Sequence, residues 1–168
     1  ALLPRYLSGA EASKELRDEI QSDLDTITEI GVKPHLEHWG IALMKALEGD
    51  VETGRLEIEK ALASDSTYDN GYSFRGGLNM LQAFGKRGEE KKSQVEKALE
   101  DYSKALLLSG ENPMYRIGRI DCLQMLGRHE EALDAANHLV ATWHDLPQSY
   151  LLRAQSRRAL GDLEGYRD

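Results

Sequence analysis

Residues 126–139, LGRHEEALDAANHL, contain residue types that could form a catalytic zinc site. A zinc-peptidase helix needs the pattern H-E-x-x-H, because only histidines one turn apart can reach the same ion. His129 and Glu130 begin this pattern, but Leu133 occupies the position of the second histidine. His138 follows nine residues after His129, which on a helix of 3.6 residues per turn points it about 180° away. We therefore interpret the His-Glu pair as the polar first turn of a helix, where acids favour the positive end of the dipole.

The other candidate chemistry in the chain is also incomplete. His35 and His38 share a helix face and could hold a metal with Glu37 or with an acid distant in the sequence. Two histidines alone do not make a site, and we interpret them as a polar turn. The sequence has no nucleophile-elbow, phosphate-loop or dinucleotide-binding glycine pattern. Its single cysteine, Cys122, excludes an internal disulfide and an all-cysteine metal site. We therefore predict that the chain is not an enzyme and uses neither a metal nor a cofactor.

The composition indicates a packed helical protein that does not bind nucleic acid. About 40% of the residues are hydrophobic and 30% are charged, which is enough for a core. The formal net charge of −8 argues against nucleic-acid binding, because phosphates need a basic face. No apolar stretch approaches the roughly 20 residues of a membrane helix. We expect no membrane insertion; the compartment stays unknown, with a soluble, cytoplasmic location favoured.

The helices that would carry these residues repeat along the chain. One set of small or apolar residues recurs at steps of 34, 44 and 34 residues: Ala42, Gly76, Ile120 and Ala154. A second set recurs at steps of 44, 34 and 34 residues: Gly54, Ala98, Ala132 and Tyr166. Both sets fit a 34-residue period with one insertion of ten residues, which we assign to the charged stretch 85–94.

Each repeat is predicted to be two helices joined by a short turn. Within 126–139, apolar residues recur at i, i+1, i+4 and i+7 and so share one helix face: Ala132, Leu133, Ala136 and Leu139. Gly127 stands where the preceding helix must end, and Asp50 suits the first cap of a second helix. Pro113 and Pro147 lie between hairpins, where a proline can begin a helix but cannot continue one.

A 34-residue helix-turn-helix unit with these small residues resembles the tetratricopeptide repeat (TPR) family. The resemblance covers about residues 35–168; Tyr72 and Tyr150 match the family's aromatic position, whereas Tyr166 stands where alanine is usual. It implies an all-α fold, a right-handed α-solenoid of antiparallel helical hairpins. The expected hairpins are 35–68, 69–112 with the ten-residue insertion, 113–146 and a truncated 147–168.

Residues 1–34 are predicted to form an N-terminal segment with a separate helix at about 8–31. Ser8 and Glu11 would complete its capping box, and Gly31 would end it. We interpret this helix as a cap over the end of the solenoid, with the second half of an earlier repeat as the alternative. We expect it to cover an apolar stripe on the first hairpin, for which a partner surface is the alternative: Leu36, Trp39, Leu43 and Leu47.

The resemblance places the binding surface on the first helices of the repeats, which line a concave groove. The groove-facing positions would be Asn70, Ser73, Gly77, Met80, Met114, Ile117, Asp121, Gln124, Gln148, Leu151, Gln155 and Arg158. From Asn112 onward every basic residue is arginine, which forms bidentate bonds with carboxylates. Unless nearby acids pair with them, four arginines could therefore form a patch for an acidic peptide: Arg116, Arg119, Arg153 and Arg157.

These patterns predict a non-catalytic protein-protein interaction scaffold that holds a peptide or a partner helix in its groove. The sequence does not identify that partner. One alternative is a regulatory or substrate-recruiting TPR domain of a larger enzyme; a more remote one is an RNA-binding helical repeat, which the acidity disfavours. The truncated last hairpin leaves Leu160, Leu163 and Tyr166 uncovered, which predicts further repeats in a longer protein or self-association.

Overall fold

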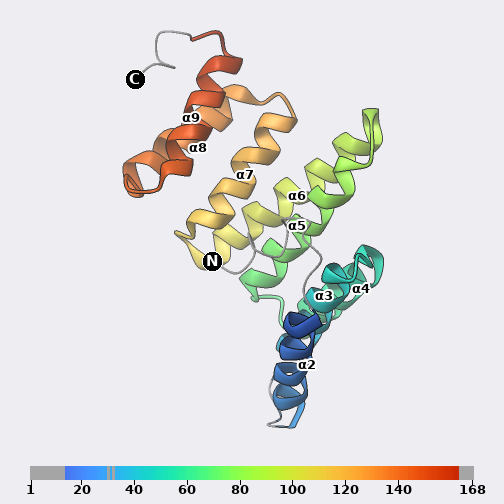
Figure 1. Ribbon diagram of the computed structural model, residues 1–168. Coiled ribbons are helices and arrows are strands. Elements are labelled where there is room, and N and C mark those ends of the chain that lie inside the picture. Colours follow the sequence, from blue (N-terminus) through green and yellow to red (C-terminus); the bar gives the residue numbers. More distant parts are fainter. Residues whose placement is uncertain (1–13, 30, 32, 163–168) are drawn as a thin grey trace. The chain divides into compact units, whose positions relative to one another are not determined.

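The computed structural model describes residues 14–29, 31 and 33–162, and every regular element among them is an α-helix (Figure 1). The contacts divide the chain into two compact units, Ala1–Gly71 and Tyr72–Asp168. The first unit contains α2 (Lys14–Glu29), α3 (Pro34–Leu47), α4 (Val51–Ser64) and the first residues of α5 (Asp69–Phe84). The second contains the rest of α5 with α6 (Gly88–Ser109), α7 (Pro113–Met125), α8 (His129–Thr142) and α9 (Pro147–Ala159). The predicted all-α class is confirmed.

Prolines, glycines and one aspartate set several helix limits, and four of them are predicted from the sequence: Asp50, Pro113, Gly127 and Pro147. Three helices begin at a proline, whose missing N–H costs no hydrogen bond there: Pro34, Pro113 and Pro147. Gly49 and Gly127 follow α3 and α7 with φ angles of 83° and 73°, which glycine adopts without strain. The Asp50 carboxylate caps α4 by accepting a hydrogen bond from the Thr53 backbone N–H at 3.1 Å. Short turns therefore join α3 to α4 and α7 to α8.

In the first unit, α3 packs against both α2 and α4. Gly54 lets α3 and α4 approach closely, because a Cβ atom there would lie 3.1 Å from the carbonyl oxygen of Ala42. On another side of α3, Leu24 of α2 packs directly on Gly40. The predicted N-terminal helix therefore exists between Lys14 and Glu29, while the predicted capping residues Ser8 and Glu11 lie outside the described residues.

In the second unit, the Tyr102 ring joins the α5–α6 hairpin to α7. The ring lies against Gly76 on α5 and Gly118 on α7. A Cβ atom would come within 3.2 Å of the ring at Gly76 and within 2.5 Å at Gly118. Since real Cβ atoms do not approach ring carbons so closely, the packing of Tyr102 requires a residue without a side chain at Gly118.

The remaining core of this unit lies between α7, α8 and α9. One cluster of almost completely buried residues joins these three helices. Its members are Ile117, Ile120 and Leu123 of α7, Ala132, Ala135, Ala136 and Leu139 of α8, and Leu152 of α9. Ala132 is among those with no exposed surface, as the repeat spacing predicts for a residue where two helices cross. Ile120, although larger than the residue usual at its position, is equally buried.

A buried polar network fixes α5 on α6. The Arg75 guanidinium donates from Nη2 to Asp101 Oδ1 at 2.6 Å and from Nε to both carboxylate oxygens at 3.1 Å. The Asn79 amide donates to Asp101 Oδ2 at 3.1 Å. Burial raises the pKa of Asp101, and the Arg75 and Asn79 hydrogen bonds oppose that shift. The network stabilises a carboxylate that would otherwise be costly to bury between the helices.

Both helices of the α5–α6 hairpin are longer than those of the next hairpin, and residues 88–94 of the assigned insertion form the start of α6. Helices α5 and α6 have 16 and 22 residues, whereas α7 and α8 have 13 and 14. The lengthened part has apolar packing of its own, because Ala83 and Val95 are buried in a cluster with Cys122 of α7. Near the tip, Lys86 and Glu90 form an ion pair with a distance of 3.4 Å. The second helix takes up more of the added length than the first.

Gly118→Ala is expected to lower the free energy of unfolding by about 1–3 kcal/mol, because the added methyl group overpacks the Tyr102 ring. Gly77→Ala is the matched control, since a Cβ atom there would lie 3.7 Å from the Tyr102 hydroxyl, an ordinary contact. The control should be neutral or stabilising by up to about 1 kcal/mol through helix propensity. Urea unfolding measures both variants. Equal effects would show that Tyr102 packing does not depend on Gly118.

Candidate partner-binding face

Helix α7 is joined on either side to another first helix of the second unit. On one side, Sγ of Cys122 lies 3.5 Å from Sδ of Met80 on α5. On the other, the Gln124 amide donates to the Leu152 carbonyl oxygen at 3.2 Å and to the Ser156 hydroxyl at 3.0 Å on α9. The first helices α5, α7 and α9 therefore follow one another, with α7 in the middle.

The open side of α7 carries Met114 and Asp121. These residues are seven positions apart, about two turns of helix, so they lie on the same side. Asp121 is three positions from Gly118, which contacts Tyr102, and three positions from Gln124, which contacts α9. Three positions along a helix correspond to about 300°, so Gly118, Asp121 and Gln124 follow one another about 60° apart around α7. Asp121 therefore points between the side that contacts Tyr102 and the side that contacts α9.

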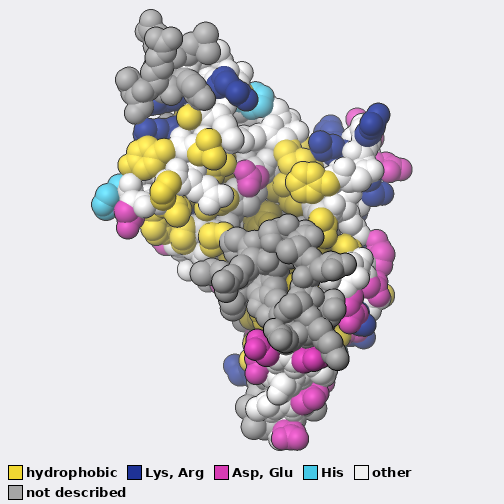
Figure 2. All heavy atoms as spheres, viewed as in Figure 1, with side chains coloured by type: hydrophobic (Ala, Val, Ile, Leu, Met, Phe, Trp, Pro, Cys, Tyr) yellow, Lys and Arg dark blue, Asp and Glu magenta, His cyan; other side chains and the backbone are white. Residues whose placement is uncertain are grey.

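We call the open side of these helices the first-helix face and define it by Met80, Met114, Asp121, Gln148, Leu151, Gln155 and Arg158. The exposed fractions of Met114 and Leu151 are 39% and 56%. The α9 residues are exposed, while Met80 and Asp121 are partly buried. Figure 2 shows hydrophobic side chains gathered over the part of the molecule where Figure 1 places α7, α8 and α9.

Two residues that the sequence assigns to the groove are buried instead. Ile117 is 5% exposed and belongs to the apolar core, because α7 packs against α6, α8 and α9 and leaves only a narrow side open. Ser73 is 7% exposed. We therefore remove both from the candidate site. Gln124 is partly buried and bonded to α9, and Asn70 is exposed but lies in the first unit.

Asp121 is the one carboxylate in the definition of the face, and its environment is unusual. Partial burial penalises the charged form of its carboxyl group and raises its pKa from 3.8 to about 6. The charge of Asp121 in turn contributes to raising the pKa of Tyr102 and of Cys122, after the larger effect of burial on both. Asp121 is thus costly to ionise unless a cation comes to it.

Two of the four arginines in the predicted acidic-peptide patch lie against aromatic rings. The Arg116 guanidinium lies 6.0 Å from the Trp143 ring centroid and 3.2 Å from the Glu111 carboxylate. The Arg153 guanidinium lies 5.3 Å from the Tyr150 ring centroid. Arg119 and Arg157 are partly buried. Aromatic rings therefore hold two of the four guanidinium groups, and the patch stays a prediction.

In the first unit, α2 covers a side of α3 next to the predicted apolar stripe. Leu24 contacts Gly40, and a pocket of about 250 Å³ is lined by Leu24 together with Ile41 and Met44. The stripe lies about a quarter turn around the helix from these contacts, and its residues are partly buried: Leu36, Trp39, Leu43 and Leu47. The described contacts of α2 therefore fall beside the stripe that we expected it to cover.

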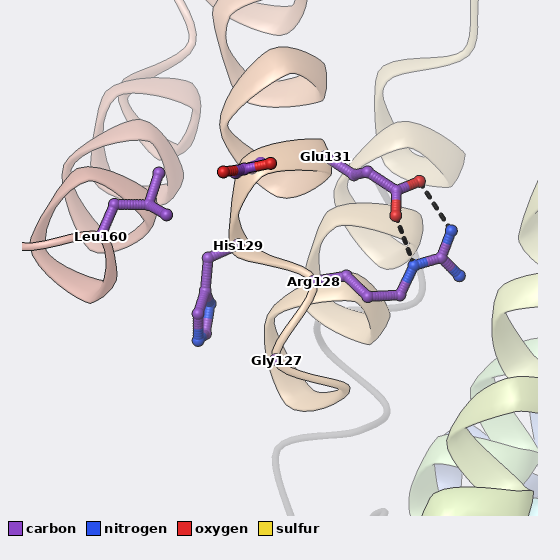
Figure 3. Close-up of a pocket in the computed structure, with 6 residues that line it drawn as sticks. Gly127, Arg128, His129, Glu131 and Leu160 are labelled. Atoms are coloured by element: carbon purple, nitrogen blue, oxygen red, sulfur yellow. Dashed lines mark hydrogen bonds and ion pairs between the residues drawn. The ribbon is translucent and has the colours of Figure 1, made fainter.

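The His-Glu pair lies at a helix start, as interpreted from the sequence. His129 is the first residue of α8, with Glu130 and Glu131 in its first turn. Figure 3 shows His129 pointing away from the Arg128–Glu131 pair, whose two N–O distances are both 2.6 Å. Together with Leu160 these residues line a surface pocket of about 270 Å³. Across the described residues, no three His, Cys, Asp or Glu side chains gather closely enough to hold a metal ion.

The interpretation of His35 and His38 as a polar turn is wrong, because both lie within the first turns of α3. His35 is 7% exposed; its Nδ1 lies 3.4 Å from Asp65, and its ring centroid lies 4.8 Å from that of Tyr68. His38 Nδ1 lies 2.8 Å from Glu57 Oε2. Both histidines therefore connect α3 to α4 and the residues that follow it.

Comparison with known proteins supports the fold. No known family model matches the sequence, and no curated protein matches it. A solved structure of a thermophilic TPR protein of Thermus thermophilus is similar with a TM-score of 0.71 over 90% of this chain and 78% of that chain, at 16% sequence identity. The chain has a TPR-like fold. At this identity the likeness concerns the fold alone. None of the described helices of the TPR-like chain is long and apolar enough to cross a membrane.

Two exposed apolar residues near the end of α5 are absent from the surface residues that the repeat spacing predicts. Leu81 is 39% exposed and Phe84 is 74% exposed. The spacing assigns positions by comparison between repeats, and this helix is longer than its counterparts. The signal that could have found them is the presence of two apolar residues three positions apart, directly before the charged insertion.

Asp121→Asn is expected to stabilise the protein at neutral pH by about 1–2 kcal/mol, because an amide need not ionise in this partly buried site. Since the folded-state pKa of about 6 lies above 3.8, stability of the wild-type chain should fall as pH rises from about 4 to 6. The variant should lack this fall. Urea unfolding between pH 4 and 8 measures it.

Asp134→Asn on α8 removes the same charge from an exposed position and serves as the control. If both variants change the pH dependence equally, the effect comes from net charge and not from the site of Asp121.

Proposed function

We propose that the chain is a non-catalytic protein-interaction module that binds a peptide or a partner helix on its first-helix face. The observation that carries this proposal is the exposure of Met114 and Leu151 on adjoining first helices, at 39% and 56%. Exposed apolar side chains bordered by polar ones are typical of interaction surfaces. Here Gln148 and Gln155 supply hydrogen-bonding groups beside them.

The residue types of the face favour binding over covalent chemistry. Its seven defining residues contain one carboxylate and no histidine, cysteine, serine or lysine. Nucleophilic catalysis requires an activated nucleophile within hydrogen-bond reach of a base, and this set supplies no such pair. The TPR-like fold supports the same interpretation, since helical repeats present extended surfaces to partners.

Photo-crosslinking tests the proposal. A photoreactive amino acid in place of Leu151 or of Met114 is expected to capture the same protein from an extract of the source cells, because both lie on one face. Leu107 is the matched control: it is 78% exposed but lies on α6, a second helix.

Leu151→Glu, combined with the photoreactive group at position 114, should reduce capture about tenfold by placing a charge in the apolar contact. Equal capture from position 107, or capture that Leu151→Glu leaves unchanged, would contradict a binding role for this face.

A further inference from the structure

The net charge of the chain lies in its first unit. Of the 29 acidic and 21 basic side chains in the sequence, 14 of each fall in residues 72–168, which leaves 15 acidic and 7 basic ones in residues 1–71. The whole charge of −8 therefore belongs to the unit that contains α2, α3 and α4. Figure 2 shows Asp and Glu side chains gathered over the part of the molecule where Figure 1 places α2. This unit attracts basic partners and repels nucleic acids and other polyanions.

Within the first unit, a cleft of about 250 Å³ lies between α2 and α3. The apolar part of its lining consists of Leu24, Ile41 and Met44, of which Leu24 and Met44 are 8% and 9% exposed. Pockets for drug-sized ligands measure about 300–1,000 Å³. The cleft is smaller, and it suits one long side chain of a partner better than a separate small molecule.

Acidic side chains border the apolar part of this cleft. Asp25 comes from α2, Glu37 from α3, and Glu48 directly follows α3. Lys45 is the one basic side chain among the described residues of the lining, and its Nζ lies 2.8 Å from Glu48 Oε2. Among the residues that the structure describes, Asp25 accepts a hydrogen bond only from the neutral Gln21 amide, and Glu37 has no hydrogen-bond or ion-pair partner. The cleft therefore has two carboxylates without a cation.

This lining has the chemistry that a lysine or arginine side chain requires. Such side chains lay their methylene stems on apolar surface while their charged ends reach polar groups. Here the stem would lie on Leu24 and Ile41, and the charged end would meet Asp25 and Glu37. The carboxylates of the cleft belong to no group of three described side chains that could hold a metal ion. The cleft is therefore complementary to a basic side chain.

Helix α2 extends the acidic border beyond the cleft. Asp18 and Glu29 stand seven positions before and four positions after Asp25, so the three lie along one side of the helix. All three are exposed. Asp18 and Asp25 are about 10 Å apart along the axis, a distance that an extended segment covers in about three residues and a parallel helix in about seven. A second basic residue at that spacing would reach Asp18.

We propose that the cleft between α2 and α3 binds a basic segment of a partner protein. One lysine or arginine of this segment lies in the cleft, next to Asp25 and Glu37, and a second one lies next to Asp18. The site goes beyond the proposed function, because it belongs to the first unit and uses no residue of the first-helix face.

Peptide display on the intact chain tests this inference. Random dodecapeptides are selected in parallel on wild type, on a cleft variant (Asp25→Asn with Glu37→Gln) and on a control variant (Glu19→Gln with Asp23→Asn). The control removes two charges from exposed positions of α2 that point away from Asp25. Wild type and the control should enrich peptides with two basic residues three or seven positions apart. The cleft variant should lose this enrichment and bind the wild-type peptides about tenfold more weakly, because two ion pairs are lost.

Two further measurements support the comparison. The affinity of the selected peptides for wild type should fall as the salt concentration rises, because exposed charges are screened. Circular dichroism melting checks that all three proteins are folded. Asp25→Asn alone keeps an acceptor for Gln21, and it should weaken binding by a smaller factor even if the double variant does not fold.

Three results would overturn the inference: selected peptides without a basic preference, an equal loss of binding in the cleft and control variants, and a basic preference that the cleft variant keeps. Leu151→Glu separates the inference from the proposed function. The basic peptides should bind this variant as they bind wild type, because Leu151 lies in the second unit. If Leu151→Glu abolishes their binding, the inference fails and the first-helix face is the peptide site.

The converse result is equally distinct. If Leu151→Glu abolishes photo-crosslinking from position 114 while no basic peptide is enriched on wild type, the proposed function stands and the cleft is not a binding site.

Discussion

The second unit depends on the space that two glycines leave for one aromatic ring. Tyr102 reaches from α6 across to α5 and α7, and Gly76 and Gly118 allow its ring to lie directly on their helices. The ring contributes, together with the apolar cluster around Cys122, to the interface between one hairpin and the next, on which repeat proteins rely for stability.

The hairpin architecture could be predicted from the sequence because it depends on spacing. Gly127 lies in the turn between two helices, His129 begins the second of them, and Ala132 is buried where the two helices cross. Each of these roles follows from the position of the residue in the 34-residue period. The exposure of side chains could not be predicted in this way. Ile117 has the spacing of a groove residue, yet it is buried because three helices surround α7. The number of neighbours around a helix is a property of the assembled fold.

The same difference explains the two histidines of α3. A pattern search treats His35 and His38 as a local pair, whereas their partners Asp65 and Glu57 come from the other side of a hairpin. Likewise, nothing in the sequence separates Asp101 from Asp121 as acids of helical stretches. The structure separates them by their surroundings: Arg75 and Asn79 converge on Asp101, while Asp121 faces the open side of α7. One acid is thus held by two side chains of the facing helix, and burial raises the pKa of the other.

The contacts between hairpins also bear on how freely the repeats could be rearranged. In arrays of near-identical repeats, each junction is equivalent, so units can be deleted, duplicated or reordered. Here the junctions are individual: Tyr102 fits the gap at Gly118, and Gln124 fits the hydroxyl of Ser156. If the α5–α6 and α7–α8 hairpins were exchanged, the Tyr102 ring would no longer face Gly118. The Gln124 amide would also lose its acceptors on α9. The backbone is periodic, but the side chains that join one hairpin to the next differ from junction to junction.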